Sequence, residues 1–464
     1  MADWLAPALA YIPQWIAHQR RITEMPGVAV ALAHNGEKLL DRTFGVANLA
    51  TAEALTPSHR FRVASHSKTF TSVGIMLLVE AGRLRLDDTA GQHVAGLHPE
   101  VAKARIAQLL SHTAGITRDG SDTGQWADRR PFLNEAELRA ALAEPPVIDA
   151  NTRMKYSNHG FGLAGLVIAA VTGEGYNDWI ARAVVKRAGL TSTAPDTPVG
   201  APLGAKVRLS QGHSAKHPVG ERLVIPAATC TNALASATGF LSTAADLVRF
   251  YASLDPAAAA SILSPASRRE MTRRHWAVPD MAGERGYGLG IIQSQVGAAG
   301  DQWAMFGHSG GFPGVKTQTA TIPSEKLTVS VLTNAADGNP GLLLEGIVHI
   351  LRGFARHGAP EPALADWTGR WWSLWDAVDL VAMGGHVVVA APGQANPFGD
   401  VPELSVTGPD SATIRRAGGF GSHGEPVRLV RGRAGKVSSV HFAGAKLVDE
   451  AAISRELRAR YGPG

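Results

Sequence analysis

The order of strand-like and helix-like segments is the feature that most constrains the fold of this chain. Asn35-Gly36 stands between apolar runs at 27–34 and 38–46, and Asn-Gly in that position is a strong hairpin signal. Helix-like patterns occur at 3–22, 66–82, 104–111, 134–143, 160–173, 177–188 and 243–253. Strand-like runs return at 286–292, 303–306, 315–322 and 327–332, before a helix-like stretch at 340–356. This order predicts an α/β fold in which one antiparallel sheet, assembled from both ends of the region, is flanked by helices.

The composition changes near Gly358. Four tryptophans follow closely, at 367, 371, 372 and 375, and short apolar runs are then separated by Gly, Pro and Asn. Runs of strand length occur at 387–391, 403–406, 412–415, 427–430 and 438–442. Several short strands at this spacing predict a small β-barrel or sandwich. We therefore expect two domains, 1–358 and 359–464.

Charge and composition argue against several classes of protein. The 464 residues include 45 basic and 40 acidic ones, and the basic pairs are scattered rather than clustered as a nucleic-acid interface requires. Cys230 is the single cysteine, so no intrachain disulfide is possible. The first residues lack the pattern of a secretory signal, and no run reaches the length of a membrane span. These features predict a soluble, cytoplasmic protein with no nucleic-acid or membrane partner.

The segment Ser65-His-Ser-Lys68 is the first candidate for chemistry. A serine at the start of a helix and a lysine three places on lie on one face, and a partly neutral lysine can activate a serine hydroxyl. Lys68 is the only lysine with a serine three places before it. The alternative is a helix cap followed by a surface lysine.

Two later segments supply what a serine nucleophile needs. Tyr156-Ser-Asn158 is the only Tyr-x-Asn in the chain; the tyrosine can relay a proton, and the asparagine can hold a substrate amide. A packed tyrosine and a capping asparagine are the alternative. His308-Ser309-Gly310-Gly311 lies between strand-like runs, where glycines let a substrate backbone approach a sheet edge closely.

Other chemistries have weaker support. Gly307 to Gly311 also fits the G-x-S-x-G nucleophile elbow, but that motif needs a helix directly after it, and the residues that follow look extended. His213 and His217 lack a helix and a glutamate partner, and one cysteine excludes most structural zinc sites. Lone cysteines such as Cys230 are mostly small buried hydrophobes. We predict no metal and no cofactor.

Taken together, the three segments resemble the motifs of the penicillin-binding protein and serine β-lactamase superfamily, in the usual order. Gln108 to Ile116, Ala235 to Asp246 and Tyr287 to Gly290 also resemble this group, so the likeness covers about 10–355. The third motif has His308 where many members have Lys-Thr-Gly, as in esterases and D-aminopeptidases of the superfamily; this argues against efficient β-lactam hydrolysis. The C-terminal region is similar to the lipocalin-like domain of some D-aminopeptidases and of penicillin-binding protein-type thioesterases.

The resemblance implies a β-lactamase-like fold with a lipocalin-like barrel, and a serine acyl-enzyme mechanism on peptide ester, thioester or amide donors. Ser65 would attack, Lys68 would accept its proton, and Tyr156 would protonate the leaving group and later activate the acceptor. Asn158 would bind the acyl amide, and His308 would keep Tyr156 and Lys68 in register. The N–H groups of Ser65 and Gly311 would form the oxyanion hole, which is typically worth about a hundredfold in rate per donor.

The resemblance also implies a D-residue at the acyl donor. Length and motif separations are closest to the thioesterases that release and cyclise nonribosomal peptides. A D-stereospecific aminopeptidase or broad esterase is the enzymatic alternative. A catalytically silent binding protein that keeps the motifs as scaffold is an alternative of another class.

Overall fold

A nine-stranded antiparallel sheet organises the larger of two units into which the chain divides, Met25–Leu344. The computed structural model describes residues 3–196, 207–279, 284–418 and 420–462. In spatial order the strands are β3 (Glu53–Ala54), β2 (Glu37–Asn48), β1 (Gly27–His34), β14 (Leu327–Thr333), β13 (Val315–Ile322), β12 (Asp301–Phe312), β11 (Ile292–Ala298), β10 (Gly286–Tyr287) and β9 (Trp276–Ala277).

The hairpin predicted at Asn35-Gly36 joins β1 to β2. Both turn residues have positive φ, 52° for Asn35 and 77° for Gly36, as the tight turn of a two-residue hairpin requires. On its other side β1 pairs with β14, from Val28 opposite Thr333 to His34 opposite Leu327. The sheet is therefore assembled from both ends of the region, which confirms the predicted architecture.

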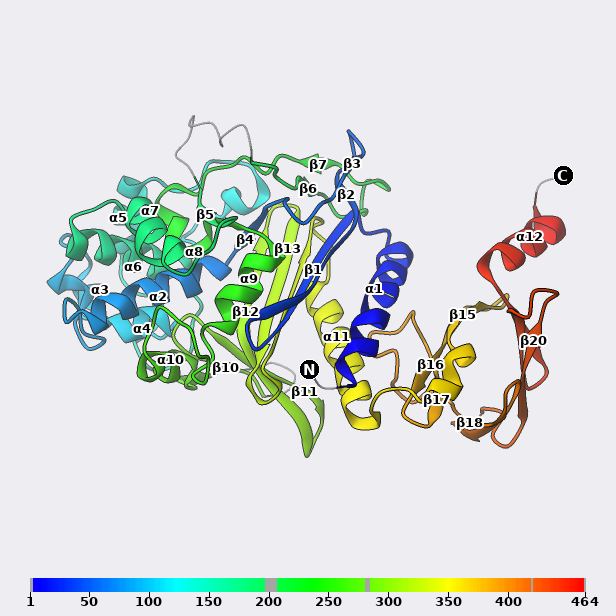
Figure 1. Cartoon of the computed structure of the whole chain (residues 1–464). Coiled ribbons are helices and arrows are strands. Elements are labelled where there is room, and N and C mark those ends of the chain that lie inside the picture. Colours follow the sequence, from blue (N-terminus) through cyan, green and yellow to red (C-terminus); the bar gives the residue numbers. More distant parts are fainter. Residues whose placement is uncertain (1–2, 197–206, 280–283, 419, 463–464) are drawn as a thin grey trace. The chain divides into compact units, whose positions relative to one another are not determined.

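Helices cover this sheet and form a helical region beside it (Figure 1). Phe70 on α2 (His66–Glu80) stacks on Phe240 of β8 (Phe240–Ser242) and on Phe250 of α9 (Ala244–Ala252), with ring centroids 4.5 and 4.0 Å apart. α9 lies against β1 and β14. The remaining helices of this unit are α3 (Pro99–Ala102), α4 (Ile106–Leu110), α5 (Glu135–Leu142), α6 (Asn158–Thr172), α7 (Tyr176–Ile180), α8 (Ala235–Thr238) and α10 (Pro265–Thr272).

Two short sheets complete the larger unit. β4 (Phe61–Ala64) pairs with β8, which also pairs with β5 (Ala194–Pro195). β6 (Gly212–His213) pairs with β7 (Val224–Ile225). β4 leads directly into α2 and contacts β12 and β13. It therefore fixes the start of α2 against the middle of the large sheet.

The second unit contains a closed eight-stranded antiparallel barrel, which confirms the predicted C-terminal β-barrel. The strands are β15 (Gly369–Trp372), β16 (Ala377–Met383), β17 (His386–Ala390), β18 (Glu403–Gly408), β19 (Ser411–Arg416), β20 (Pro426–Arg431), β21 (Val437–Phe442) and β22 (Ala445–Val448). Trp372 opposite Val448 closes the ring. Buried Trp367 and Trp371 fill its interior with aliphatic side chains, and α12 (Glu450–Tyr461) follows.

The first helix, α1 (Leu5–Ile22), belongs to the barrel's unit, which consists of Met1–Glu24 and Glu345–Gly464. The Tyr11 hydroxyl donates to Asp379 Oδ2 (2.8 Å), and Gln19 Nε2 donates to the Pro392 carbonyl (2.6 Å). Most of α11 (Pro340–His357) joins the same unit, where Gly346 packs against Trp15. By these contacts α1 and most of α11 group with the barrel, and the domains 1–358 and 359–464 stay a prediction.

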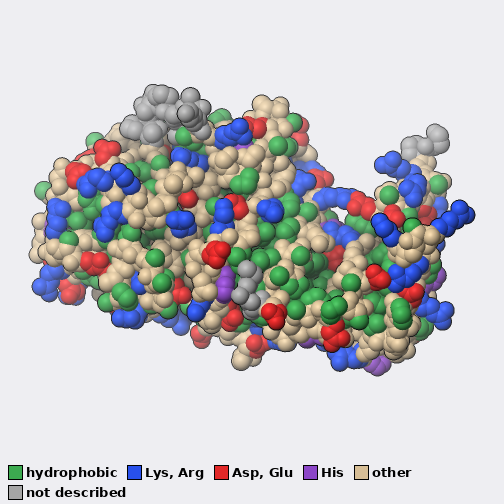
Figure 2. Space-filling model, in the orientation of Figure 1, with side chains coloured by type: hydrophobic (Ala, Val, Ile, Leu, Met, Phe, Trp, Pro, Cys, Tyr) green, Lys and Arg blue, Asp and Glu red, His purple; other side chains and the backbone are tan. Residues whose placement is uncertain are grey.

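The surface and helices add two observations. On the face shown in Figure 2, lysine and arginine side chains lie scattered among acidic and uncharged ones. Of the helices in the described ranges, none has the length and apolar character needed to cross a bilayer.

Candidate active site

Ser65 stands at the junction between β4 and α2. Ala64 before it has a φ of 46°, a left-handed conformation that non-glycine residues rarely adopt and that recurs at active sites. The Ser67 hydroxyl donates to the Ala64 carbonyl (2.6 Å) and stabilises this turn. Ser65 caps α2 without using its side chain as the cap. Its hydroxyl is therefore available for chemistry.

Lys68 is fully buried one turn into α2. Its Nζ lies 3.2 Å from Ser65 Oγ, 2.7 Å from Asn158 Oδ1 and 2.9 Å from the Ala237 carbonyl. Burial lowers the pKa of Lys68 well below its ordinary value, because an ammonium ion loses its hydration there. A neutral amine this close to a serine hydroxyl can act as its general base.

Tyr156 lies in the loop before α6, with its ring centroid 4.7 Å from Lys68 Nζ. Its phenol hydrogen-bonds to Ser65. Burial raises the pKa of Tyr156 above its ordinary value, although the bond with Ser65 acts in the opposite direction. The phenol therefore keeps its proton at neutral pH and can donate it.

His308 sits in β12 with both ring nitrogens engaged. Nδ1 lies 2.6 Å from the Ser309 carbonyl, and Nε2 lies 2.9 Å from the Tyr287 hydroxyl. A carbonyl only accepts, so Nδ1 carries the proton and Nε2 accepts from Tyr287. Burial lowers the pKa of His308 well below its ordinary value, with smaller contributions from His66 and Lys68. A neutral imidazole with one defined tautomer results.

Within the part of the chain that the structure describes, no strand pairs with the edge of β12 beside Ser65. β11 pairs with β12 only as far as Gly307, opposite Ile292, whereas β13 continues to pair through Phe312. A β-carbon on Gly310 would lie 2.3 Å from the Val63 carbonyl oxygen, but one on Gly311 would have no atom within 4 Å. Gly310 thus permits close packing on β4, and Gly311 faces open space.

These groups converge on a cavity of about 810 Å³. Among the predicted residues Ser65, Tyr156, Asn158, His308, Ser309 and Gly311 line it, while Lys68 and Gly310 support it from behind. Apolar side chains form part of its wall: Trp126, Met154, Val278, Pro279 and Ile292. Three arginines also line it, at 118, 153 and 285. The structure therefore brings all eight predicted residues together.

Asp119, Tyr287 and His112 are among the residues at the site that received no predicted role. Asp119 is buried and accepts from Asn158 Nδ2 (2.7 Å). The ring centroid of His112 lies 4.1 Å from that of Tyr156, and its Nδ1 accepts from the Ser157 N–H. Two of them lie in segments noted for family likeness, but only the fold reveals their partners.

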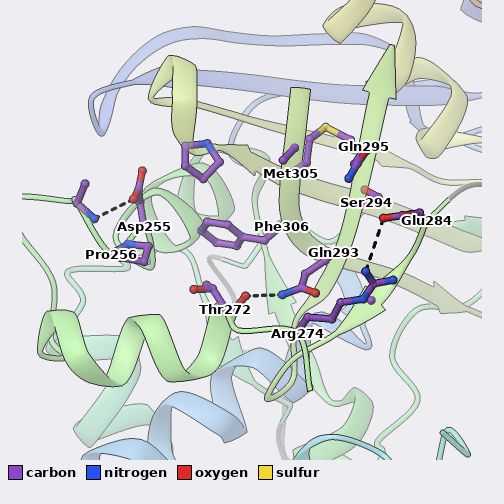
Figure 3. Close-up of a pocket in the computed structure, with 14 residues that line it drawn as sticks. Asp255, Pro256, Thr272, Arg274, Glu284, Gln293, Ser294, Gln295, Met305 and Phe306 are labelled. Atoms are coloured by element: carbon purple, nitrogen blue, oxygen red, sulfur yellow. Dashed lines mark hydrogen bonds and ion pairs between the residues drawn. The ribbon is translucent and has the colours of Figure 1, made fainter. Parts of the chain in front are cut away.

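A second cavity, of about 490 Å³, is lined by residues of β10, β11 and β12 together with neighbouring loops (Figure 3). Gly286 and Gln293 line it, while their chain neighbours Tyr287 and Ile292 line the first cavity. Its described lining residues include one serine, Ser294, but no lysine. The paired serine and lysine thus distinguish the first cavity.

The alternative nucleophile motif at Gly307 to Gly311 is excluded by the local structure. These residues lie within β12, and the chain turns at Gly314 into β13 rather than into a helix. A nucleophile elbow needs a strand-to-helix turn. Within the described ranges, no three His, Cys, Asp or Glu side chains form a group that could hold a metal.

Comparison with protein-family models gives a match over most of the chain. The β-lactamase family model matches residues 12–349. Protein flp of Staphylococcus aureus (strain COL) is 27% identical over 183 residues, which are 39% of this chain and 36% of flp. The chain thus aligns with just over a third of the length of the first curated relatives.

Solved structures are similar over larger parts of the chain. An octameric penicillin-binding protein homologue from Pyrococcus abyssi has a TM-score of 0.65 at 22% identity, covering 95% of this chain and 99% of that one. The structure of SurE with D-Leu has a TM-score of 0.59 at 21% sequence identity, and the match covers 95% of this chain and 99% of SurE. D-amino acid amidase from Ochrobactrum anthropi SV3, complexed with L-phenylalanine amide, has a TM-score of 0.64 at 21% sequence identity. The match covers 76% of this chain and 99% of the amidase. At these identities the likenesses establish the fold.

Proposed function

Since this chain belongs to the β-lactamase family of serine hydrolases, we propose that it transfers peptide acyl groups through an acyl-enzyme on Ser65. One observation carries the proposal: the buried Lys68 amine lies 3.2 Å from Ser65 Oγ. Lys68 takes the Ser65 proton while Oγ bonds to the acyl carbon, and the N–H groups of Ser65 and Gly311 stabilise the resulting oxyanion. Tyr156 protonates the leaving thiol, alcohol or amine as its bond to the acyl carbon breaks.

The second half of the reaction reuses the same groups. Tyr156 takes a proton from the acceptor, which attacks the ester carbonyl, and Ser65 leaves and regains a proton from Lys68. Water as acceptor gives a linear acid, and an amine of the same peptide gives a macrocycle. The unpaired edge at Ser309 to Gly311 supports an extended peptide donor, because backbone groups there can pair with one more strand.

The finer assignment is a thioesterase that releases and head-to-tail cyclises a nonribosomal peptide ending in a D-residue. The barrel that follows the hydrolase fold agrees with the resemblance to such thioesterases, and the likeness to SurE with D-Leu over 95% of the chain supports the D-residue. A D-stereospecific amidase or aminopeptidase is the second candidate, supported by the likeness to D-amino acid amidase. A cytoplasmic location remains a prediction of the cyclase proposal.

A fluorophosphonate probe tests the nucleophile. We expect stoichiometric labelling of Ser65, none in Ser65→Ala, and normal labelling in Ser72→Ala. Ser72 is a matched control because it is also buried in α2 and its hydroxyl has no hydrogen-bond partner among the described residues. An unlabelled wild-type protein that is folded would refute the enzyme and favour the silent binding protein.

A pair of peptide thioesters separates the two enzymatic candidates. The linear peptides differ only in a D- or L-configured last residue, and the product mass is measured. A product one water lighter than the free acid, formed from the D-peptide alone, is expected for the cyclase. Linear acid as the sole product would contradict cyclisation and favour the hydrolytic candidate.

A further inference from the structure

Among the described residues that line the catalytic cavity, Asp119 carries the one carboxylate, and it is only 6% exposed. A buried charge is costly unless its oxygens are hydrogen-bonded. Here Oδ1 accepts from Asn158 Nδ2 at 2.7 Å, and Oδ2 accepts from Arg118 Nε at 3.1 Å. The Asn158 N–H in turn donates to the Arg118 carbonyl at 2.9 Å. The loop of Asp119 is therefore held at the first turn of α6.

The orientation of the Asn158 side chain follows from this contact. A carboxylate offers acceptors only, so it requires the NH₂ end of the amide on its own side. The amide oxygen is then directed to Lys68, whose Nζ lies 2.7 Å from it. Were the amide turned around, its NH₂ would meet the lysine N–H groups and its oxygen would meet the carboxylate.

The same geometry directs the lone pair of Lys68. A neutral amine has two N–H donors and one lone pair. Two acceptors lie beside it that cannot donate, Asn158 Oδ1 at 2.7 Å and the Ala237 carbonyl at 2.9 Å. The third neighbour, Ser65 Oγ, lies at 3.2 Å and carries a proton. With both N–H groups engaged, the lone pair is left for the Ser65 hydroxyl.

We propose that Asp119 and Arg118 are positioning residues for the general base. Asp119 holds the Asn158 side chain so that the Lys68 lone pair points at Ser65. The negative charge of Asp119 and the positive charge of Arg118 together set how readily Lys68 holds a proton. Neither residue touches the reacting atoms. The inference rests on the proposed function and adds to it how the base is oriented and tuned.

The two charges act on Lys68 in opposite directions. Burial has the largest effect and lowers the pKa of Lys68, Asp119 raises it, and Arg118 lowers it further. The other titratable groups that face the amine are Tyr156, His112 and His308. Burial raises the pKa of the phenol and lowers the pKa of both imidazoles, so all three are neutral near pH 7. Asp119 and Arg118 are therefore the charges whose removal should move the titration of Lys68.

The test is the rate of Ser65 labelling by a fluorophosphonate probe as a function of pH. The rate rises as Lys68 loses its proton. In Asp119→Asn we expect that rise at lower pH, together with a plateau about tenfold to a hundredfold lower, because a mispositioned base is that costly. In Arg118→Gln we expect the rise at higher pH. Asp122→Asn, the same change three residues on at an exposed carboxylate outside the cavity, should leave the profile unchanged.

Salt separates the two effects further. The Arg118 side chain is 65% exposed, so 1 M salt should reduce the shift of the pH profile that Arg118→Gln causes. Asp119 is buried, so the shift that Asp119→Asn causes should persist in 1 M salt. If the pH profile of labelling does not move in either variant, or moves in the same direction in both, the inference is overturned. The assignment of Ser65 as the nucleophile would still stand. If Asp119→Asn fails to fold, the surface variant Arg118→Gln decides alone. Absence of labelling in the wild type would overturn the proposed function and this inference with it.

Discussion

Gly310→Ala is the substitution whose effect the structure specifies most sharply. Gly310 lies in β12 where this strand crosses β4, the strand that carries the chain into Ser65. An added β-carbon would lie 2.3 Å from the Val63 carbonyl oxygen and 2.5 Å from Thr317 Oγ1. The first of these is backbone in a paired strand, so the methyl group cannot be accommodated by a side-chain rotation.

The magnitude follows from the two distances. An ordinary carbon–oxygen contact is more than 3 Å, so β12 and β4 must separate by most of an ångström. Overpacking of this kind costs about 1–3 kcal/mol of folding free energy. The same displacement moves the third motif away from Ser65, and a misplacement of about 1 Å costs roughly a hundredfold in rate.

The assay compares Gly310→Ala with Gly311→Ala in denaturant unfolding and in fluorophosphonate labelling. Gly311 is the matched control, because a β-carbon there meets nothing within 4 Å. We expect a lower unfolding midpoint for the first variant and an unchanged one for the second. Equal midpoints and equal labelling rates for Gly310→Ala and the wild type would refute the argument from close packing.

Three further outcomes are expected. Lys68 must be neutral to accept a proton, and burial lowers its pKa. The labelling rate of Ser65 should therefore rise with pH and reach its plateau well below pH 10.5, the ordinary pKa of a lysine. A rise centred near pH 10.5 would contradict this expectation. Tyr287→Phe removes the donor to His308 Nε2 and should lower the labelling rate, together with about 1–2 kcal/mol of unfolding free energy; an unchanged labelling rate in the folded variant would make Tyr287 purely structural. Tyr11→Phe removes a buried hydrogen bond to Asp379 and should lower the unfolding free energy in denaturant by about 1–2 kcal/mol, with labelling unaffected; an unchanged unfolding curve would refute that contribution.

Local patterns were sufficient to predict most of the sheet and the motif residues. A few neighbouring residues are enough to predict each of three features: the Asn35-Gly36 turn, the apolar run of β14 and the apolar stripe along α2. Glycine-rich β12 is longer than predicted, Asp301–Phe312 instead of 303–306, because glycines dilute the strand pattern. β15 and β16 were missed, since tryptophans and an aspartate interrupt their alternation.

Contacts between distant residues account for what the sequence could not predict. Asp119 and Asn158 are 39 positions apart, and Tyr287 and His308 are 21 apart. A single sequence carries no signal for such pairs, because each residue has an ordinary local explanation as a loop or strand residue. The motif residues were predictable because each motif is short and sets the residue types that the chemistry needs at a fixed local spacing.

The membership of α1 in the barrel's unit has a consequence for how the chain is made. Its side chains leave the ribosome before those of the larger unit, yet Asp379 and Pro392, to which Tyr11 and Gln19 bond, leave it after them. The segment 25–344 is in this sense an insertion in the other unit, and it can fold while α1 still awaits its partners. If the chain were shortened at residue 344 alone, the apolar face of α1 would lose its packing partners. A minimal hydrolase unit should therefore also start at residue 25.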